Sequence, residues 1–260
     1  MTDYQVVSKT RHHAQKWKRY TNYLFAGSDP VAEIAFEEVD RAALRYPLAF
    51  IKTDSGFRLA VVLGLEPGQN LYVDRQGIWS VDYVPAVYRA YPFALMTDGS
   101  EQHVVCIDVD SGLADASAGE DYFDENGEPS ASLDQIIQFL VATENGLQKT
   151  RKICDSLDKL GLIEPWPLSI KFESDERTIS DLYRINVTRL NELEPAVLAE
   201  LRNSGVLKLV YAQSISIQNM YTLGKLFEQA SLDATSQFGK PDSKELQFLN
   251  DDGAISFDQF

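Results

Sequence analysis

The sequence is poor in the residues that hold metals and disulfides. It has only two cysteines, Cys106 and Cys154, and three histidines among 260 residues. A single cysteine pair is no disulfide framework, and the chain contains no CxxC or Cys/His spacing of a zinc site. The adjacent His12 and His13 point apart in either regular structure. We therefore expect no metal site, and we interpret both cysteines as small buried residues.

Long apolar runs are also missing. The longest stretch without a charged residue, 209–224, includes several polar side chains, and it falls short of the roughly 20 apolar residues of a membrane helix. The first residues lack the apolar segment of a signal peptide. We therefore expect a soluble protein without an integral membrane segment, cytoplasmic by default, and export that needs no such signal stays open.

Basic residues are outnumbered. The 24 Lys and Arg face 39 Asp and Glu, which gives a formal net charge of −15. A surface of this sign repels nucleic acid and anionic lipid, so we expect neither as a partner. The exception is the N-terminal segment, where basic residues cluster between Lys9 and Arg19. We interpret residues 1–28 as an N-terminal arm with a solvated, basic surface.

Catalytic signatures are absent as well. No GxSxG, GxGxxG, GxxxxGK[ST] or HExxH motif occurs, so nothing points to a nucleophilic elbow, a phosphate-binding loop or a metalloprotease helix. The acidic loop 110–130 fails the calcium-loop register, because Gly127 at position six places Tyr122 and Leu133 at ligand positions. We expect no cofactor, and the missing motifs favour a protein that is not an enzyme.

Local strand pairs dominate the middle of the chain. Residues 48–53 and 57–65 flank the turn signal Asp54–Gly56, and such hairpins predict antiparallel sheet rather than βαβ units. Further strand pairs are predicted at 70–74 with 78–83, at 91–96 with 103–108 around Asp98–Gly99, and at 168–173 with 178–186, followed by a single strand at 206–212.

Helical periodicity and caps add four helices. Asp29–Pro30 is typical of an N-cap followed by proline at the first helical position. Helices are predicted near 30–46, 132–160, 195–204 and 217–230. The fold class is therefore α+β, mainly antiparallel sheet with several packed helices. We expect residues 29–260 to form a single domain, with two intimately packed halves meeting near residue 130 as the alternative.

Several unusual short strings occur in order along the chain. The densest block includes Leu63–Leu65, Gly68–Asp74, Gly77–Trp79, Asp82–Ala86 and Arg89–Phe93. Supporting strings are Tyr46–Phe50, Tyr23–Ala26, Cys106–Asp108 and Gly205–Ala212 with Ser216 and Asn219. Together they resemble the SapC family of bacterial proteins, which is named from an association with surface-layer (S-layer) export.

The resemblance implies an accessory function rather than a reaction. The family has no established catalytic activity, and its link to surface-layer or transport systems is genetic association. The leading hypothesis is a non-catalytic binding or accessory protein of a surface-layer, secretion or uptake system that recognises a protein or peptide partner. The alternatives are an enzyme or cofactor-dependent modifier of small molecules or peptides, and a structural subunit of the surface layer itself. The oligomeric state stays open.

An aromatic cluster around one arginine is the candidate binding site. Arg89 offers a planar fork for a carboxylate or phosphate, and the neighbouring aromatic rings offer stacking faces. The competing interpretation makes the rings part of the core and pairs Arg89 with a carboxylate such as Asp82. The candidate binding residues are Asn70, Trp79, Tyr83, Tyr88, Arg89, Tyr91 and Phe93.

The two interpretations of Arg89 predict different outcomes for one substitution. If Arg89 contacts a partner, Arg89→Ala should weaken partner binding and leave the melting temperature nearly unchanged. A large loss of stability without a specific binding defect would instead assign Arg89 to the structure. Thermal unfolding and partner binding, measured on the same preparation, separate the two.

Overall fold

A five-stranded antiparallel sheet carries the larger core. The computed structural model describes residues 3–97, 102–171, 176–179 and 181–237. The strand order is β3 (Val31–Glu33), β5 (Gly56–Val62), β4 (Leu48–Thr53), β12 (Leu182–Ile185) and β9 (Ile163–Pro165). β4 and β5 form the predicted hairpin across the turn at residues 54 and 55. The fold class α+β with antiparallel sheets is confirmed.

A separate, smaller sheet stands beside it. Its order is β1 (Tyr4–Val6), β7 (His103–Asp108) and β6 (Phe93–Thr97), again antiparallel. The β6–β7 hairpin was predicted, and its turn at 98–99 lies outside the described residues. A two-stranded ribbon of β2 (Lys16–Trp17) and β8 (Glu120–Asp121) packs nearby. Together these strands enclose a second core with Trp17, Phe93, Ile107, Tyr122 and Leu133.

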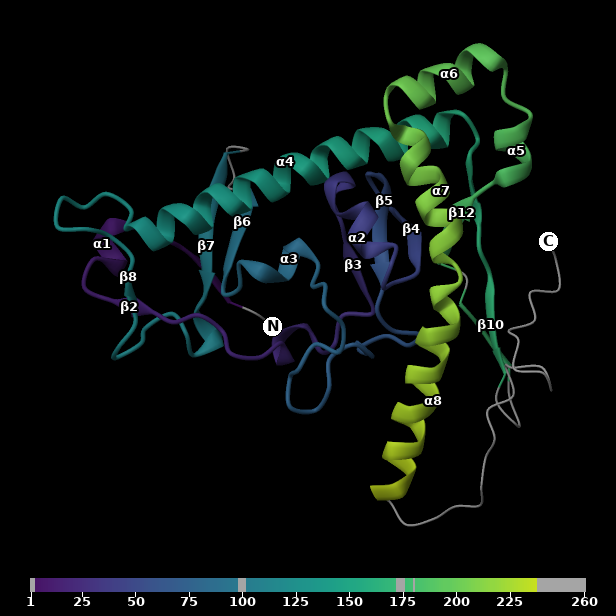
Figure 1. The fold of residues 1–260 in the computed structure, drawn as a ribbon. Coiled ribbons are helices and arrows are strands. Elements are labelled where there is room, and N and C mark those ends of the chain that lie inside the picture. The colour runs from purple at the N-terminus through teal and green to yellow at the C-terminus, as the bar shows by residue number, and fades with distance from the viewer. Residues whose placement is uncertain (1–2, 98–101, 172–175, 180, 238–260) are drawn as a thin grey trace.

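One long helix joins the two cores. α4 (Ala131–Lys159) begins at Ser130, whose hydroxyl accepts a hydrogen bond from the Leu133 backbone N–H at 3.2 Å. This is a side-chain N-cap. Figure 1 shows α4 crossing above the small sheet and then above the large one. Leu133 near its start belongs to the small core, and Leu157 near its end belongs to the large one.

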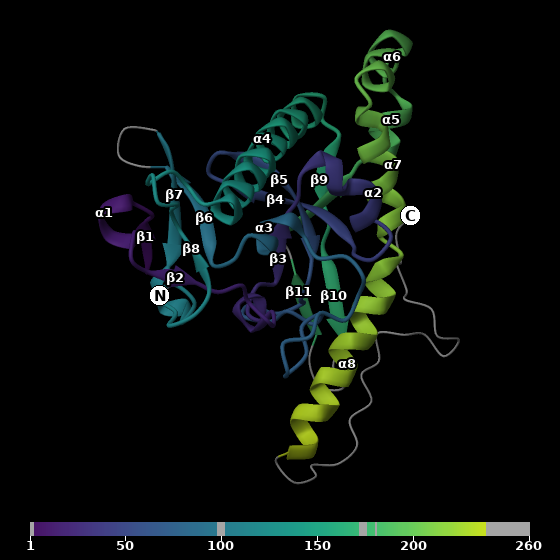
Figure 2. The same cartoon turned by 60° about the vertical axis from the view of Figure 1, so that its left-hand side comes forward.

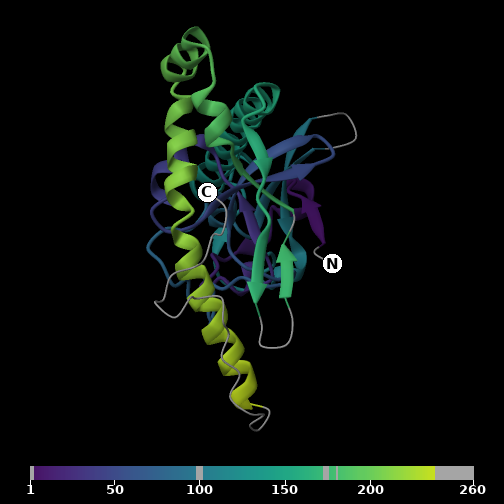
Figure 3. The same cartoon turned by 90° about the vertical axis from the view of Figure 1, so that its right-hand side faces the viewer.

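The C-terminal helices cover one side of the large sheet. α5 (Val187–Asn191) and α6 (Pro195–Asn203) lead into α7 (Val206–Ser216) and α8 (Asn219–Gln237). Figures 2 and 3 show α7 and α8 following one another as a column beside the strands. The remaining elements are short: α1 (Lys9–His12), η1 (Leu24–Ala26), η2 (Phe36–Glu38), α2 (Val39–Ala42), α3 (Ala86–Arg89), η3 (Val109–Ser111), and the hairpin β10 (Leu168–Lys171) with β11 (Glu176–Ile179).

Buried polar groups attach α7 to the sheet. Gln213, with none of its surface exposed, donates from Nε2 to the Leu48 carbonyl at 2.9 Å and accepts from the Ile185 N–H at 3.1 Å. Continued in the same register, the β4–β12 ladder would bring Leu48 opposite Ile185, two positions beyond its last pair, Phe50 with Tyr183. The Gln213 side-chain amide therefore takes the place of a direct bond where the two strands separate. Ser216 Oγ accepts from the Leu48 N–H at 2.9 Å.

Four predicted elements were wrong. The strand predicted over 178–186 belongs to two sheets, because β11 pairs with β10 whereas β12 pairs with β4 and β9. Residues 31–33 form an edge strand on β5 instead of the first turn of a helix over 30–46, and only Val39–Ala42 is α-helical there. Residues 206–212 are helical and not a strand, because a short apolar run in a core does not reveal its period. The predicted pair 70–74 with 78–83 is reduced to one bridge between Val73 and Trp79.

The basic N-terminal segment meets the acidic loop. Lys16 pairs with Asp121 at 2.5 Å, and Arg19 pairs with Glu120 at 2.7 Å. The basic groups lie at the surface, whereas Trp17 between them is buried in the small core. The segment thus contributes strands and an aromatic anchor to the fold. The boundary at residue 28 and the division into halves near 130 stay predictions.

The Gln213 bridge makes a prediction about stability. Gln213→Leu keeps a similar volume but leaves the Leu48 carbonyl and the Ile185 N–H buried without partners. We expect it to lower the free energy of unfolding by about 2–4 kcal/mol, because each unsatisfied buried group costs about 1–3 kcal/mol. Urea unfolding measures this change. Gln218→Leu, on an exposed position between α7 and α8, is the matched control, and equal effects of both variants would contradict the bridge.

Candidate functional site

The structure divides the predicted binding residues into three sets. Asn70, Trp79 and Tyr83 belong to the buried interior. Asn70 donates to the Ala26 carbonyl at 2.9 Å and accepts from the Tyr72 N–H at 3.0 Å. Trp79 donates from Nε1 to the Tyr46 hydroxyl at 2.8 Å. Their polar atoms form hydrogen bonds within the protein, so these residues support the candidate site and do not contact a ligand through those atoms.

Arg89 is held by its own segment. Its Nε donates to the Val84 carbonyl at 2.8 Å, and its guanidinium carbon lies 4.9 Å from the centre of the Tyr83 ring. The suggested pairing of Arg89 with Asp82 is wrong, because Asp82 forms a bidentate ion pair with Arg45, with bonds of 2.5 and 2.9 Å. Arg89 is half-buried.

Tyr88, Tyr91 and Phe93 line a cleft of about 520 Å³. The cleft lies under the middle of α4, between α3 and strands β6 and β7. Its other walls come from β1, from the segment around Phe25 and Asp29, and from α4 residues between 140 and 147. Phe25 and Tyr91 stack with ring centres 3.8 Å apart and planes 9° apart. Arg89 does not line it.

The polar lining of the cleft is acidic. It contains the carboxylates of Asp29, Asp108 and Glu144, and none of the described residues that line it is Lys, Arg or His. Tyr88 donates from its hydroxyl to Asp29 at 3.0 Å, and Tyr91 donates to Asp108 at 2.9 Å. The charge of this cleft is thus opposite to the one that an acidic ligand requires.

Burial shifts the titration of these groups. It raises the pKa of the Asp29 carboxyl, against the opposing effect of the Tyr88 hydrogen bond. Burial together with the neighbouring carboxylates raises the pKa of the tyrosines in the cleft. Tyr4 lies beside Asp108, Tyr88 beside Asp29 and Tyr91 beside Asp108. The phenols therefore keep their protons at neutral pH, and Asp29 is less acidic than an exposed aspartate.

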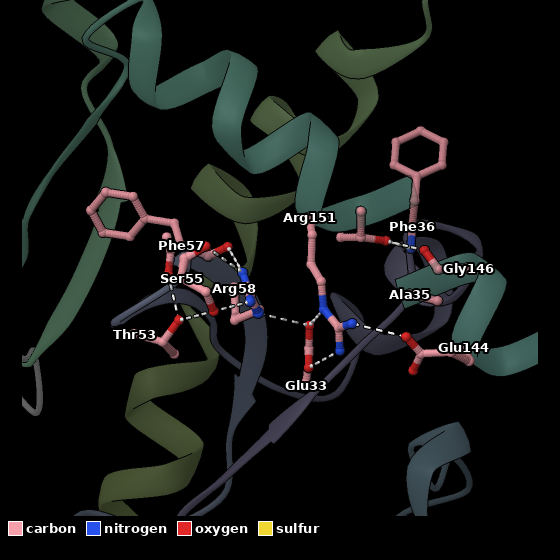
Figure 4. Close-up of polar contacts among 12 residues, drawn as sticks. Glu33, Ala35, Phe36, Thr53, Ser55, Phe57, Arg58, Glu144, Gly146 and Arg151 are labelled. Atoms are coloured by element: carbon pink, nitrogen blue, oxygen red, sulfur yellow. Dashed lines mark hydrogen bonds and ion pairs between the residues drawn. The ribbon is translucent and has the colours of Figure 1, made fainter. Parts of the chain in front are cut away.

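Glu144 differs from the other two carboxylates because an arginine compensates its charge. Arg151, two turns further along α4, donates from Nη1 to Glu144 at 2.9 Å and holds Glu33 of β3 with two bonds of 2.9 and 3.0 Å. Figure 4 shows Arg151 between the two carboxylates, with Arg58 on the other side of Glu33. This cluster fixes α4 to the large sheet beside the cleft.

The cleft carboxylates were missed for identifiable reasons. Asp29 was interpreted as an N-cap, but no helix follows it. Asp108 stood only as the last residue of an apolar strand. Glu144 did leave a signal, because it lies four residues after Leu140 and three before Leu147. It therefore interrupts an apolar helical stripe with a charge.

The described part of the chain gives little support to thiol or metal chemistry. Cys106 and Cys154 are both buried and free, and burial raises the pKa of the Cys154 thiol to about 12. Among the described residues, no group of three His, Cys, Asp or Glu side chains is arranged to hold a metal ion. None of the described helices combines the length and apolarity that crossing a bilayer requires.

The fold and the cleft define an α+β protein in which a cleft of ligand size lies between the small antiparallel sheet, α3 and α4. The family model described as SapC matches residues 7–223. The chain therefore belongs to the SapC family. Neither the curated proteins nor the solved structures contain a significant match.

The raised pKa of Asp29 makes a prediction about stability and pH. The folded state binds a proton on Asp29 more readily than the unfolded chain, so this group costs stability as pH rises above about 4. We expect Asp29→Asn to raise the melting temperature at pH 7 by about 1–2 °C. The gain should shrink toward pH 4, where the wild-type carboxyl becomes protonated.

Calorimetry at both pH values tests this expectation. Asp54→Asn, in the exposed turn between β4 and β5, is the control with a similar change in net charge. A variant that is less stable than the wild type at pH 7 would contradict it.

Proposed function

We propose that this protein is a non-catalytic binding or accessory protein, and that its cleft receives a segment of a protein or peptide partner. The SapC association suggests that the partner belongs to a surface-layer, secretion or uptake system. The observation that carries the proposal is the cleft under α4. It joins a stacked aromatic pair to polar groups from separate segments, the combination with which pockets typically orient a ligand.

The candidate residues take different roles in this proposal. Tyr88, Tyr91 and Phe93 are the contact residues, because they line the cleft. Asn70, Trp79 and Tyr83 support them, since their side chains pack or bond within the interior. Arg89 lies next to Tyr88 but outside the lining, so its substitution tests whether the contact extends beyond the cleft.

One observation favours the enzymatic alternative. Asp29 is a carboxyl with a raised pKa inside a cleft, which is a property of many acid–base catalysts. In that case the cleft would retain a small molecule rather than a polypeptide. The two functions therefore predict different bound masses.

Filling the cleft tests the proposal directly. Thr143 lines the cleft, whereas its neighbour Ala142 is exposed on α4 and does not line it. We expect Thr143→Trp to displace the partner and Ala142→Trp to retain it. Native mass spectrometry of the wild type and both variants, isolated gently from the source cells, measures the bound species.

Each outcome has a distinct meaning. A second polypeptide in stoichiometric amount with the wild type and Ala142→Trp, and its loss with Thr143→Trp, supports the proposal. A polypeptide retained by all three proteins would place the contact elsewhere. A small mass that only Thr143→Trp loses would replace the binding function with the enzymatic one.

A further inference from the structure

The charge of the cleft specifies the group that it receives. We infer that the cleft binds the cationic end of a basic side chain, the ammonium of a lysine or the guanidinium of an arginine, in the partner polypeptide. This inference rests on the proposed function and names the chemistry of the same site. Three features of the cleft carry it: carboxylates without cationic partners, neutral aromatic rings, and a volume that suits a side chain.

In the described part of the chain, two of the three carboxylates have only neutral donors. Asp29 accepts from the Tyr88 hydroxyl at 3.0 Å, and Asp108 accepts from the Tyr91 hydroxyl at 2.9 Å and from the Asp110 N–H at 3.0 Å. Within the described ranges, neither forms an ion pair with a basic residue. Asp108 is only 4% exposed. Carboxylates that are withdrawn from water without a counter-ion favour a cation that enters.

Glu144 provides an internal comparison. Its charge is compensated by Arg151, which also holds Glu33 of β3. The protein therefore supplies a cation where a carboxylate serves to fix α4, and the described residues supply none to Asp29 or Asp108. We expect the incoming cation to approach those two, with Glu144 forming a fixed acidic wall.

The aromatic lining also favours a cationic side chain. Tyr4, Phe25, Tyr88, Tyr91 and Phe93 surround the carboxylates, and the tyrosines stay protonated and neutral because their pKa values are raised. Neutral rings attract ammonium and guanidinium groups through their faces, and they also cover the aliphatic stem of such a side chain. A carboxylate or phosphate would gain nothing from this lining.

Size and long-range charge point to a polypeptide with basic residues. A cleft of about 520 Å³ accommodates one long side chain and not a folded element. The net charge of −15 gives the surface a field that steers cationic partners toward it. A basic segment of a partner therefore finds both an attractive surface and a specific receptor for one of its side chains.

The test uses short peptides and the full chain. The probes are acetylated and amidated pentapeptides with glycine at every position except the third, which is lysine, arginine, norleucine or glutamate. Norleucine keeps the aliphatic carbons of lysine and removes the ammonium. Saturation-transfer NMR at low ionic strength measures their relative affinities. We expect the lysine and arginine peptides to bind at least about tenfold more tightly than the norleucine peptide.

Two variants tie this binding to the cleft. Thr143→Trp should abolish binding of the lysine peptide, and Asp29→Asn should weaken it by about fivefold or more. Because Asp29→Asn is expected to be slightly more stable than the wild type, weaker binding there does not reflect unfolding. Asp54→Asn, with a similar change in net charge on an exposed turn, should bind as the wild type does.

The inference and the proposed function fail in different ways. Equal binding of the lysine and norleucine peptides, with Thr143→Trp blocking both, would leave a peptide-binding cleft and overturn its cationic specificity. Preference for the glutamate peptide would also overturn it and would favour Arg89 as the contact. Binding of none of the peptides overturns the cationic inference, and the mass-spectrometric experiment on the intact partner then decides the proposed function independently.

Discussion

The position of α4 controls the arrangement of the whole molecule. Among the described strands, no ladder joins the three-stranded sheet to the five-stranded one, so their relative placement depends on what packs across both. α4 does so, because Leu133 enters one core and Leu157 the other. Arg151 adds an electrostatic attachment through Glu33. The cleft lies beneath the middle of this helix, against the small sheet and α3.

Polar side chains have different kinds of partner in the large core and at the cleft. In the large core, the polar atoms of Asn70 and Trp79 find partners within the protein and add to rigidity. At the cleft, the carboxylates of Asp29 and Asp108 have only neutral donors among the described residues. The large core thus satisfies these polar atoms within the protein, whereas the cleft holds negative charge that the described residues leave uncompensated. Such a division is typical of a rigid scaffold that presents a preorganised site.

Local signals in the sequence predicted local structure well and long-range structure poorly. The β4–β5 and β6–β7 hairpins and the whole of α4 follow from turn residues, caps and helical spacing. The edge strand at Val31 was missed because it pairs with β5, which follows only after β4, and local turn signals do not reveal such a pairing. The residues of this strand also continue the apolar spacing of the predicted helix. α7 was missed because a short apolar run has no visible period. The cleft required knowing that Asp29 and Asp108, far apart in sequence, meet at one place, and no spacing rule contains that information.

The strand pairings also determine the order in which the chain can assemble. β1 is made first, yet Tyr4 pairs with Asp108. β4 is made early, yet its Ile51 pairs with Leu182 of β12. The end of the β4–β12 ladder also needs Gln213 of α7, which bonds to the Leu48 carbonyl. Contacts between such distant segments slow folding and lengthen the time for which strand edges stay unpaired. During synthesis, the β4 edge therefore stays unpaired until β12 has left the ribosome, and the end of this ladder is completed only after α7 with Gln213 has followed.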